Sequence, residues 1–342
     1  MRRTKNVETS STREKIAVVG AGAWGTTLAW MLARRGFSVS LWVRRAQLAE
    51  QIAGTRRNPY RPEIHLPPQV HVTADIACAV SGAWLVILAV PSHGLRQVVQ
   101  NALEHWPRGA IALSAAKGLE RPSGLTMSQV IAETLGDRTG AIAALSGPNL
   151  SEEIVRGSPS AAVVASQDDG AARACQETLS SDIYRVYTNT DIIGVELCGA
   201  LKNVIAVAAG ISDGLGYGEN TKAALITRGL VEMSTVVAAR GGDPRTCWGL
   251  AGVGDLVATC HSPLSRNYSV GYMIGRGETV SSAASKIRGV AEGLFTSSAI
   301  IGWAQGKLDL PIAQAVHDVV NLGLDPADVA QRLMARPRRA EL

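Results

Sequence analysis

The chain has 342 residues, of which 46% are hydrophobic, 4% are aromatic and 35 are glycines; this composition is typical of a globular α/β or α protein and argues against disorder. Because a single core seldom grows beyond roughly 250 to 300 residues, we expect two domains. The formal charge of +5 lies at the two ends, residues 1–15 and 336–342, and the body between them is balanced, which argues against a nucleic-acid-binding surface.

The N-terminal segment 1–14 is polar and basic, and we expect a disordered tail there. A short β-branched strand is predicted over 15–20, followed at once by the G-x-G-x-x-G turn of 20–25 and by a helix over 23–35. Strand, turn and helix together supply the tight bend, the close backbone approach and the amide donors that a dinucleotide pyrophosphate needs. The alternative is a strand-to-helix turn that uses glycine for packing alone.

A second strand, predicted over 38–43, should end beside the adenosine ribose of such a cofactor. The residue there is usually acidic when the cofactor has a free 2′-hydroxyl, but this chain has Arg44 and Arg45. Two guanidinium groups suit a 2′-phosphate better than a hydroxyl, so the sequence favours NADP(H) over NAD(H). The alternative is a pair of surface arginines that stack on the adenine.

Strands and helices continue to alternate, with strands predicted over 83–90 and 110–116 and a helix over 91–102. Ligands of open α/β sheets bind beyond the carboxyl ends of the strands, which places Lys117 where a substrate or nicotinamide would lie. His93 follows its own strand at the same edge and is a second candidate. Packing against the cofactor explains His93 at least as well as catalysis does.

Further strands are predicted over 141–146, 160–166 and 183–187, with a sharp turn at 147–149. Beyond about residue 190 the period becomes helical, with helices predicted over 192–211, 221–239, 291–303 and 312–322. The sequence therefore predicts an α/β fold with an N-terminal Rossmann-type dinucleotide-binding domain over 15–190. An all-α substrate domain follows over 191–335, and a short basic tail over 336–342 ends the chain.

The helix predicted over 192–211 is apolar except for Glu196, Lys202 and Asn203. A buried ammonium group costs several kcal/mol unless it is paired or partly hydrated. Lys202 therefore either forms a core ion pair, with Glu196 as a first candidate, or lines a cleft where it handles a proton or an anion. The segment approaches membrane-spanning length, but its charges and glycines indicate a buried helix rather than a membrane span.

The five cysteines are scattered without a C-x-x-C pair, and the six histidines show no ligand spacing. This pattern predicts a reducing compartment and no structural metal. No apolar region precedes the first strand, so we expect no secretory signal and a cytoplasmic protein. For its oligomeric state, a homodimer is the commonest form among soluble proteins.

Nine short sequence blocks occur in a characteristic order: VVGAGAWG (18–25), LW (41–42), VPSH (90–93), AKGLE (116–120), SGP (146–148), LKNVIA (201–206), AGVGDL (251–256), SRN (265–267) and VAEG (290–293). In this order and spacing they resemble the NAD(P)-dependent sn-glycerol-3-phosphate dehydrogenase family of bacterial type, over nearly the whole chain. The resemblance implies reversible hydride transfer between nicotinamide and a small phosphate substrate, dihydroxyacetone phosphate. The product, sn-glycerol 3-phosphate, is the backbone of phospholipids.

The same resemblance makes Lys202 the proton donor in reduction and the acceptor in oxidation, with Lys117 and Asp255 completing the catalytic group. Burial and a second ammonium nearby would lower the pKa of Lys202 from about 10.4 towards neutrality. The expected substrate contacts are Lys117, Gly147, Asn149, Lys202, Asn203, Asp255, Ser265, Arg266 and Asn267. The expected cofactor contacts are Gly20, Gly22, Ala23, Trp24, Gly25, Arg44, Arg45, Lys117, Ser151, Arg266, Val290 and Glu292.

The chain departs from the family pattern after the SGP block, where the family commonly has a small hydroxyl residue and then Phe-Ala. This chain has Asn149, Leu150 and Ser151, and asparagine can still donate to and accept from a substrate. Two other interpretations remain open. One is a related two-domain dehydrogenase of a hydroxy acid, which would not need Arg266 for a phosphate. The other is a dinucleotide-binding protein without turnover, which the joint presence of both lysines and Asp255 speaks against.

Overall fold

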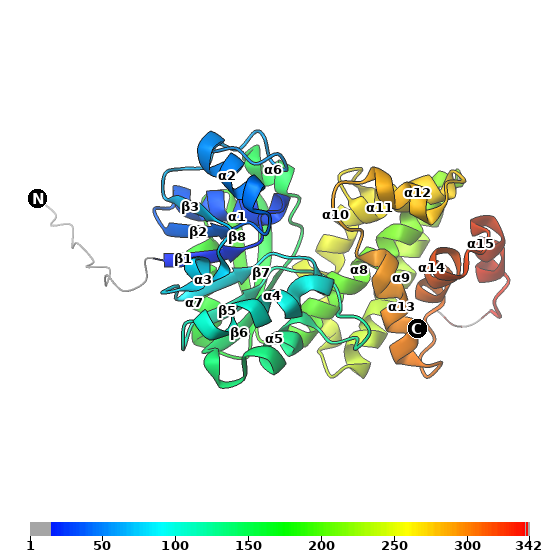
Figure 1. Ribbon diagram of the computed structural model, residues 1–342. Coiled ribbons are helices and arrows are strands. Elements are labelled where there is room, and N and C mark those ends of the chain that lie inside the picture. The colour runs from blue at the N-terminus through cyan, green and yellow to red at the C-terminus, as the bar shows by residue number, and fades with distance from the viewer. Residues whose placement is uncertain (1–14, 339, 341–342) are drawn as a thin grey trace, which may run out of the picture.

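The computed structural model describes residues 15–338 and 340. They form two parts that lie side by side, a twisted sheet with helices on both faces and an all-helical part (Figure 1). The predicted fold class, a Rossmann-type domain followed by a helical domain, is confirmed. The predicted tail over 1–14 lies outside the described residues.

The sheet has eight strands: β1 (Lys15–Val19), β2 (Ser38–Trp42), β3 (Val70–Thr73), β4 (Leu85–Leu88), β5 (Ile111–Ser114), β6 (Ala141–Ser146), β7 (Ser160–Ser166) and β8 (Tyr184–Asn189). Their order across the sheet is β3-β2-β1-β4-β5-β6-β7-β8. Every neighbouring pair is parallel except β6 and β7, which are antiparallel. The carboxyl ends of β1, β2, β4, β5 and β6 therefore meet at one edge, where ligands of such sheets bind.

Helices cover both faces of this sheet. On one face lie α1 (Ala23–Arg34), α2 (Ala46–Thr55), α6 (Ser151–Val155) and α7 (Asp169–Leu179). On the other lie α3 (Ile76–Val80), α4 (Leu95–Ala102) and α5 (Met127–Leu135), with the 3₁₀ turns η1 (Ser92–Gly94), η2 (Leu103–His105) and η3 (Gly136–Arg138) among the connections. Val18 and Val19 of β1 point into opposite clusters, as the alternation of side chains along a strand requires. Because both faces are covered, the central strands are continuous apolar runs.

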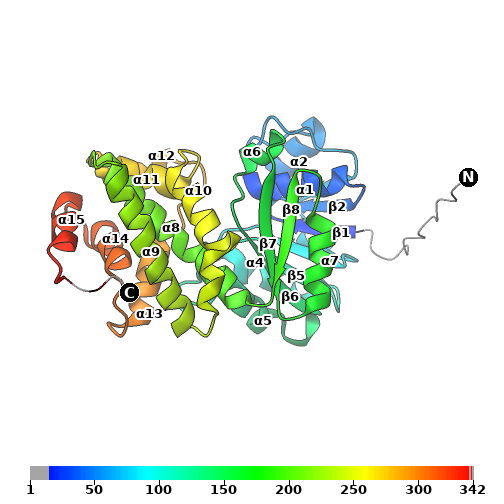
Figure 2. The same cartoon turned by 180° about the vertical axis from the view of Figure 1, so that it is seen from behind.

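The helical part is built around α8 (Ile192–Gly214), with α9 (Glu219–Ala239) alongside it (Figure 2). The other elements are η4 (Pro244–Trp248), the π-helical turn η5 (Leu250–Gly254), α10 (Asp255–His261), α11 (Arg266–Gly275), α12 (Val280–Lys286), α13 (Gly293–Ala304), α14 (Pro311–Leu322) and α15 (Pro326–Met334). Within residues 15–338 and 340, α8 alone is long and apolar enough to cross a membrane, but 89% of its most apolar stretch is buried inside the protein. It is therefore packed as a core helix, as the sequence predicts.

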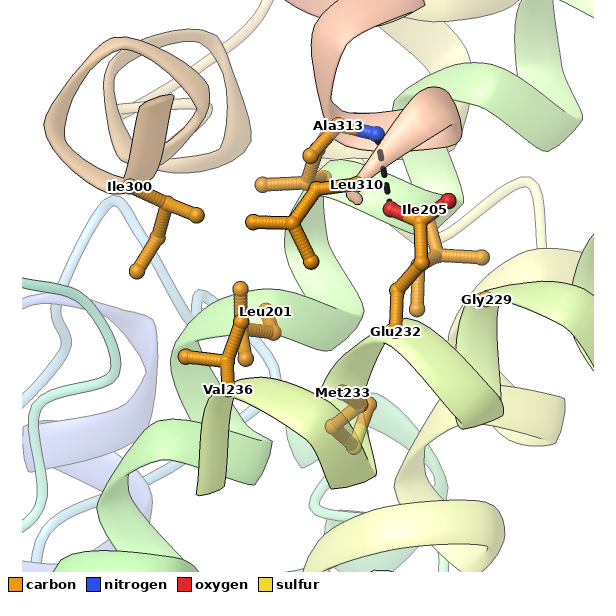
Figure 3. A pocket seen from close by; sticks show the side chains of 10 residues that line it. Leu201, Ile205, Gly229, Glu232, Met233, Val236, Ile300, Leu310 and Ala313 are labelled. Carbon is orange, nitrogen blue, oxygen red and sulfur yellow. Dashed lines mark hydrogen bonds between the residues drawn. The ribbon is translucent and has the colours of Figure 1, made fainter. Parts of the chain in front are cut away.

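A buried carboxylate joins the start of α14 to α9. Glu232 of α9 accepts hydrogen bonds from the backbone N–H of Ile312 at 2.6 Å and of Ala313 at 3.0 Å. These are two of the unpaired N–H groups of the first turn of α14. Figure 3 shows the bond from Ala313. Apolar side chains such as Leu310 line the same pocket as Glu232 (Figure 3), and burial raises the pKa of Glu232 to about 7.

The predicted elements are present with shifted ends. The strand predicted over 83–90 is confined to β4, the helix predicted over 91–102 begins as the 3₁₀ turn η1, and the helix predicted over 192–211 continues to Gly214. The sequence did not predict α2, β3, α3, α5, α7, α10, α11, α12 and α15. Most of these are short or weakly patterned, and a single sequence gives little signal for such elements.

Candidate active site

Two lysines and one aspartate form the centre of the site. Lys117 Nζ lies 2.6 Å from Asp255 Oδ2, and Lys202 Nζ lies 3.1 Å from Asp255 Oδ1. Lys117 also donates to the carbonyl oxygen of Gly147 at 2.8 Å. Thr259 accepts from Lys202 at 2.7 Å and donates to Asp255 Oδ1 at 3.2 Å. One carboxylate thus holds two ammonium groups that lie far apart in the sequence.

Burial and charge set the protonation of this cluster. Burial lowers the pKa of Lys202 to about 8; Asp255 opposes that fall and Lys117 adds to it. Burial also disfavours the ionised form of Asp255, but the two lysines outweigh it and hold the pKa of Asp255 below its ordinary value. Lys202 can therefore hold or release a proton close to neutral pH, which is what a group acting as both acid and base requires.

Glu196, the first candidate for a partner of Lys202, is engaged elsewhere. Its carboxylate accepts from the backbone N–H of Ser128 at 2.8 Å and from the Ser128 hydroxyl. Burial raises the pKa of Glu196, although the bonds from Ser128 oppose the rise. The pairing of Lys202 with Asp255 rather than with Glu196 agrees with the resemblance.

The local chain explains how the three groups meet. Lys117 follows β5 and Gly147 follows β6, so both lie at the carboxyl edge of the sheet. Lys202 lies near the middle of α8, and Asp255 begins α10 directly after η5. Gly252 inside η5 has φ −91° and ψ −107°, which is not helical. This break turns α10 so that its first residue faces α8 and the sheet edge, and π-helical turns are frequent at functional sites.

A second group of expected substrate contacts stands at the N-terminus of α11. Ser265 caps this helix, its hydroxyl accepting from the Tyr268 N–H at 3.2 Å. Arg266, the first residue of the helix, is exposed to solvent, while the protein around it lowers its pKa by desolvation. A free guanidinium beside the first N–H groups of a helix is suited to binding an anion.

Two buried amides connect this helix end to α8. Asn267 Nδ2 donates to Asn203 Oδ1 at 2.8 Å, and Asn267 Oδ1 accepts from the Gly293 N–H at 2.9 Å. Asn203 Nδ2 donates to the carbonyl oxygen of Gly199 at 3.2 Å. Each amide nitrogen carries two hydrogens, so each keeps one for a ligand. Because Asn203 directly follows Lys202 in α8, the bond between the two amides holds the start of α11 beside Lys202.

Two buried polar atoms at the end of β6 and in the turn after it have no hydrogen-bond partner among the described residues. They are Ser146 Oγ, in the last residue of β6, and Asn149 Nδ2, in the turn. The other side-chain atom of Asn149, Oδ1, accepts from the Tyr184 hydroxyl at 2.8 Å. Buried polar groups are almost always paired, and each exception needs an explanation. A ligand bound beside Lys117 and Gly147 would provide one.

The glycine turn fits a dinucleotide. A side chain on Gly25 would place its Cβ 1.9 Å from the carbonyl oxygen of Gly20, and one on Gly20, with φ +116°, would lie 2.6 Å from Ala89 O. Gly22 by contrast has open space beside it and is the N-cap residue of α1, with no side-chain cap bond. Two glycines therefore pack the turn tightly, and the third leaves room for phosphates at a helix N-terminus. Ala23, which follows Gly22, begins α1.

The expected ribose-end arginines follow β2 directly. Arg44 and Arg45 are exposed, and Arg45 Nη2 lies 3.4 Å from the Tyr60 hydroxyl. Both groups are therefore accessible beyond the strand that should face the adenosine ribose. On the opposite side of the glycine turn, Ser151 begins α6 and its hydroxyl accepts from Arg61 Nη2 at 2.5 Å. Ser151 is thus close to the turn after β6, in which Asn149 Nδ2 has no partner among the described residues.

Glu292 joins the two parts of the molecule at the expected cofactor contacts. Its carboxylate accepts from the Ser92 N–H at 3.1 Å and from the Ser92 hydroxyl at 2.8 Å. Val290 and His93 line one pocket beside this contact, between the end of β4 and the start of α13. His93 has no hydrogen bond that joins it to the lysine cluster, so its place in the pocket wall favours packing over catalysis.

Within residues 15–338 and 340, no group of three or more His, Cys, Asp and Glu residues is arranged to hold a metal ion. All five cysteines are free thiols.

Comparison with known protein families accounts for almost the whole chain. Residues 15–172 match the N-terminal family model described as NAD-dependent glycerol-3-phosphate dehydrogenase N-terminus, and residues 191–331 match the corresponding C-terminal model. The chain belongs to the NAD-dependent glycerol-3-phosphate dehydrogenase family. The resemblance inferred from the nine sequence blocks is therefore confirmed.

Individual members of this family are similar over their full length. A glycerol-3-phosphate dehydrogenase [NAD(P)+] of Chlorobium limicola is 45% identical over 330 residues, covering 96% of this chain and 99% of the relative. One from Corynebacterium glutamicum is 46% identical over 329 residues, covering 95% and 99%. The crystal structure of glycerol-3-phosphate dehydrogenase from Coxiella burnetii superposes with a TM-score of 0.91 at 35% identity, covering 95% of this chain and all of that one.

The structure also places two residues in the candidate active site that the sequence did not predict. Thr259 bonds to both Lys202 and Asp255, and it lies four residues after Asp255, on the same face of α10. Helical spacing would have identified it, had α10 been predicted. Tyr184 lies in β8, an edge strand of the sheet. No sequence pattern identifies it, because only the tertiary fold brings it to Asn149.

Proposed function

We propose that this chain catalyses the reversible NAD(P)H-dependent reduction of dihydroxyacetone phosphate to sn-glycerol 3-phosphate. Membership of the dehydrogenase family and the activity after which its relatives are named support this reaction. The observation that carries the chemistry is the pair of lysines held by Asp255. The reaction needs a proton source at the carbonyl, positive charge for a phosphate and a cleft with little water.

In this proposal Lys202 moves the proton. Bound nicotinamide supplies the hydride to the substrate carbon, or takes it in the reverse direction. The ammonium of Lys202 donates a proton to the carbonyl oxygen during reduction, and its neutral amine accepts one from the hydroxyl during oxidation. A pKa of about 8 allows both forms near neutral pH. Lys117 and Asp255 orient the substrate and Lys202.

The phosphate would bind at the N-terminus of α11. Arg266 supplies paired donors in one plane, and Ser265 and Asn267 supply a hydroxyl and an amide hydrogen. Gly147, Asn149 and Asn203 complete the substrate pocket from the other side. In this arrangement residues 15–190 supply most of the cofactor contacts, and residues 191–335 supply Lys202 and the phosphate-binding groups.

The proposed cofactor is NADP(H) in preference to NAD(H). Ala23, Trp24, Ser151, Val290 and Glu292 would hold the dinucleotide, together with the glycine turn, and the exposed arginine pair after β2 supports a 2′-phosphate. Replacing both arginines by alanine should lower kcat/KM for NADPH by about tenfold or more, because each charge-assisted bond contributes about 1.5–3 kcal/mol. The value for NADH should change little, and an unchanged preference would contradict the assignment.

The reaction itself is tested by single-turnover oxidation of NADPH by dihydroxyacetone phosphate. Lys202→Ala should bind NADPH normally and lose about 10²- to 10⁴-fold in rate, the usual contribution of a general acid. Lys286→Ala is a matched control, because Lys286 is a half-exposed lysine paired with Glu278. If the Lys202 variant turned over at the wild-type rate, Lys202 would not be the proton donor.

We further propose a place for the reaction in the cell. The five free thiols support a reducing, cytoplasmic setting. The product would supply the glycerol phosphate backbone of phospholipids. The proposal includes a homodimer, which sedimentation at micromolar concentration would test.

A further inference from the structure

Asn149 departs from the family pattern, and its surroundings show how its amide is used. Tyr184 is the first residue of β8 and pairs with Ser160 in the register of β7 and β8. Ser146, the last residue of β6, pairs with Val163 of β7. Because β7 runs antiparallel to β6, the start of β7, and with it the start of β8, extends past the end of β6. Tyr184 is thereby placed beside the turn that carries Asn149.

The Tyr184 side chain is completely buried, with no exposed surface. Its ring lies 6.3 Å from that of Trp24, measured between centroids, with the two planes tilted by 56°. Burial raises the pKa of Tyr184 above its ordinary value, so its hydroxyl stays protonated at neutral pH. That hydroxyl donates to Asn149 Oδ1 at 2.8 Å. Because the amide oxygen faces Tyr184, the amide nitrogen faces the other side.

The other atom is Asn149 Nδ2, which is buried and has no partner among the described residues. Leaving such a donor unpaired costs about 1–3 kcal/mol, and an acceptor oxygen on a bound ligand would remove that cost. The same turn is held by Lys117, which donates to the carbonyl oxygen of Gly147 at 2.8 Å. Pro148 lies against Gly254, the residue before Asp255. The turn that carries the unpaired donor therefore lies beside the lysine cluster.

We propose that Tyr184 is a positioning residue, which holds the Asn149 amide so that Nδ2 donates to an acceptor oxygen of the bound phosphate ester. This inference rests on the proposed function and adds to it a residue that no block of the sequence points to. The Tyr184 hydroxyl does not touch the substrate. It selects the donor side of the amide, which suits a ligand whose carbonyl and phosphate oxygens accept hydrogen bonds.

A double-mutant cycle tests this arrangement. Tyr184→Phe keeps the ring against Trp24 and removes only the hydroxyl; it should raise KM for dihydroxyacetone phosphate about five- to tenfold, the effect of one hydrogen bond. KM for NADPH should not change. Asn149→Ala should raise KM for the phosphate ester at least as much, and adding Tyr184→Phe to it should have no further effect. Tyr187→Phe is the matched control, because Tyr187 lies on the same strand and is 45% exposed.

A further variant tests whether residue 149 acts as a hydrogen-bond donor or as an acceptor. Asn149→Asp keeps an acceptor for Tyr184 but removes both amide hydrogens, so it should bind the phosphate ester more weakly than Asn149→Ala. Additive effects of the Tyr184 and Asn149 changes, a change confined to KM for NADPH, or wild-type KM in Asn149→Asp would each overturn the proposal. If wild-type protein did not reduce dihydroxyacetone phosphate at all, the proposed function would fail instead, so the two failures are distinguishable.

Discussion

Removing the charge of Asp255 should move the pH dependence of the reaction to lower pH. Asp255→Asn keeps the shape of the side chain but takes away the carboxylate that lies 3.1 Å from Lys202 Nζ. Asp255 raises the pKa of Lys202, against the larger effect of burial and the smaller one of Lys117. In the variant the lowering effects of burial and Lys117 remain, opposed only by the smaller raising effect of Cys260. The ammonium of Lys202 should therefore lose its proton more easily.

The size of the change follows from the geometry. An opposite charge within about 4–6 Å shifts a pKa by about 1–3 units, and this pair is closer and almost fully buried. The pKa of Lys202 is about 8 in the native protein. Reduction needs the protonated form, so kcat/KM for dihydroxyacetone phosphate should fall above about pH 8 in the wild type. In the variant the midpoint of that fall should lie about 1–3 pH units lower.

Two measurements would establish this change. Stopped-flow oxidation of NADPH from pH 5 to 10 gives the midpoint from turnover, and competitive acetylation of Lys202, quantified by mass spectrometry, gives it without turnover. Asp309→Asn is the control, because Asp309 is an exposed partner of Arg336 and its loss should not move the midpoint. A midpoint that stays in place or rises in Asp255→Asn would refute the assignment of Lys202 as the titrating group.

Further predictions concern packing and stability. Gly199→Ala would bring a Cβ 2.9 Å from Ser146 Oγ and 3.5 Å from Lys117 Cγ, so it should lower both kcat and Tm, whereas Gly302→Ala, with nothing within 4 Å, should not. Glu232→Ala should cost about 2–4 kcal/mol in urea unfolding, since two N–H groups of α14 lose their acceptor. Burial raises the pKa of Glu232 from 4.5 to about 7, so its protonated form favours the folded state. The stability of wild type relative to Glu232→Gln should therefore fall as pH rises from about 4.5 to about 7.

The parts of the fold that a single sequence predicts are those with a strong local pattern. The central strands are continuous apolar runs because helices cover both faces of the sheet, and the glycine turn is defined by backbone conformation. α8 is recognisable because almost every residue in it is buried. By contrast α10 and α11 combine polar site residues with short apolar runs, so their helical period is hidden. These two helices carry Asp255 and Arg266, which only the family resemblance identified.

Local sequence spacing does not identify the partner of Lys202. Glu196 is a charged neighbour in the same helix, but residues six apart point to different sides of an α-helix, whereas residues three or four apart share a face. Helix geometry alone therefore disfavours that pair. The true partner, Asp255, lies 53 residues further along the chain, and no spacing rule connects them. The burial of the Lys202 ammonium predicts that it has a partner, but not which residue that partner is.

The two halves of the site must also keep a fixed separation, because one lysine follows the sheet and the other lies in α8. Glu196 accepts from the N–H and hydroxyl of Ser128, and Glu292 accepts in the same way from Ser92. Both carboxylates come from the helical part; Ser128 lies in the first turn of α5, and Ser92 begins the 3₁₀ turn η1 that leads into α4. A carboxylate held by two donors at a helix start is favoured by the helix dipole as well as by the bonds. Two such contacts resist relative rotation of the two parts more than one would, so they fix the distance that Asp255 spans between the lysines.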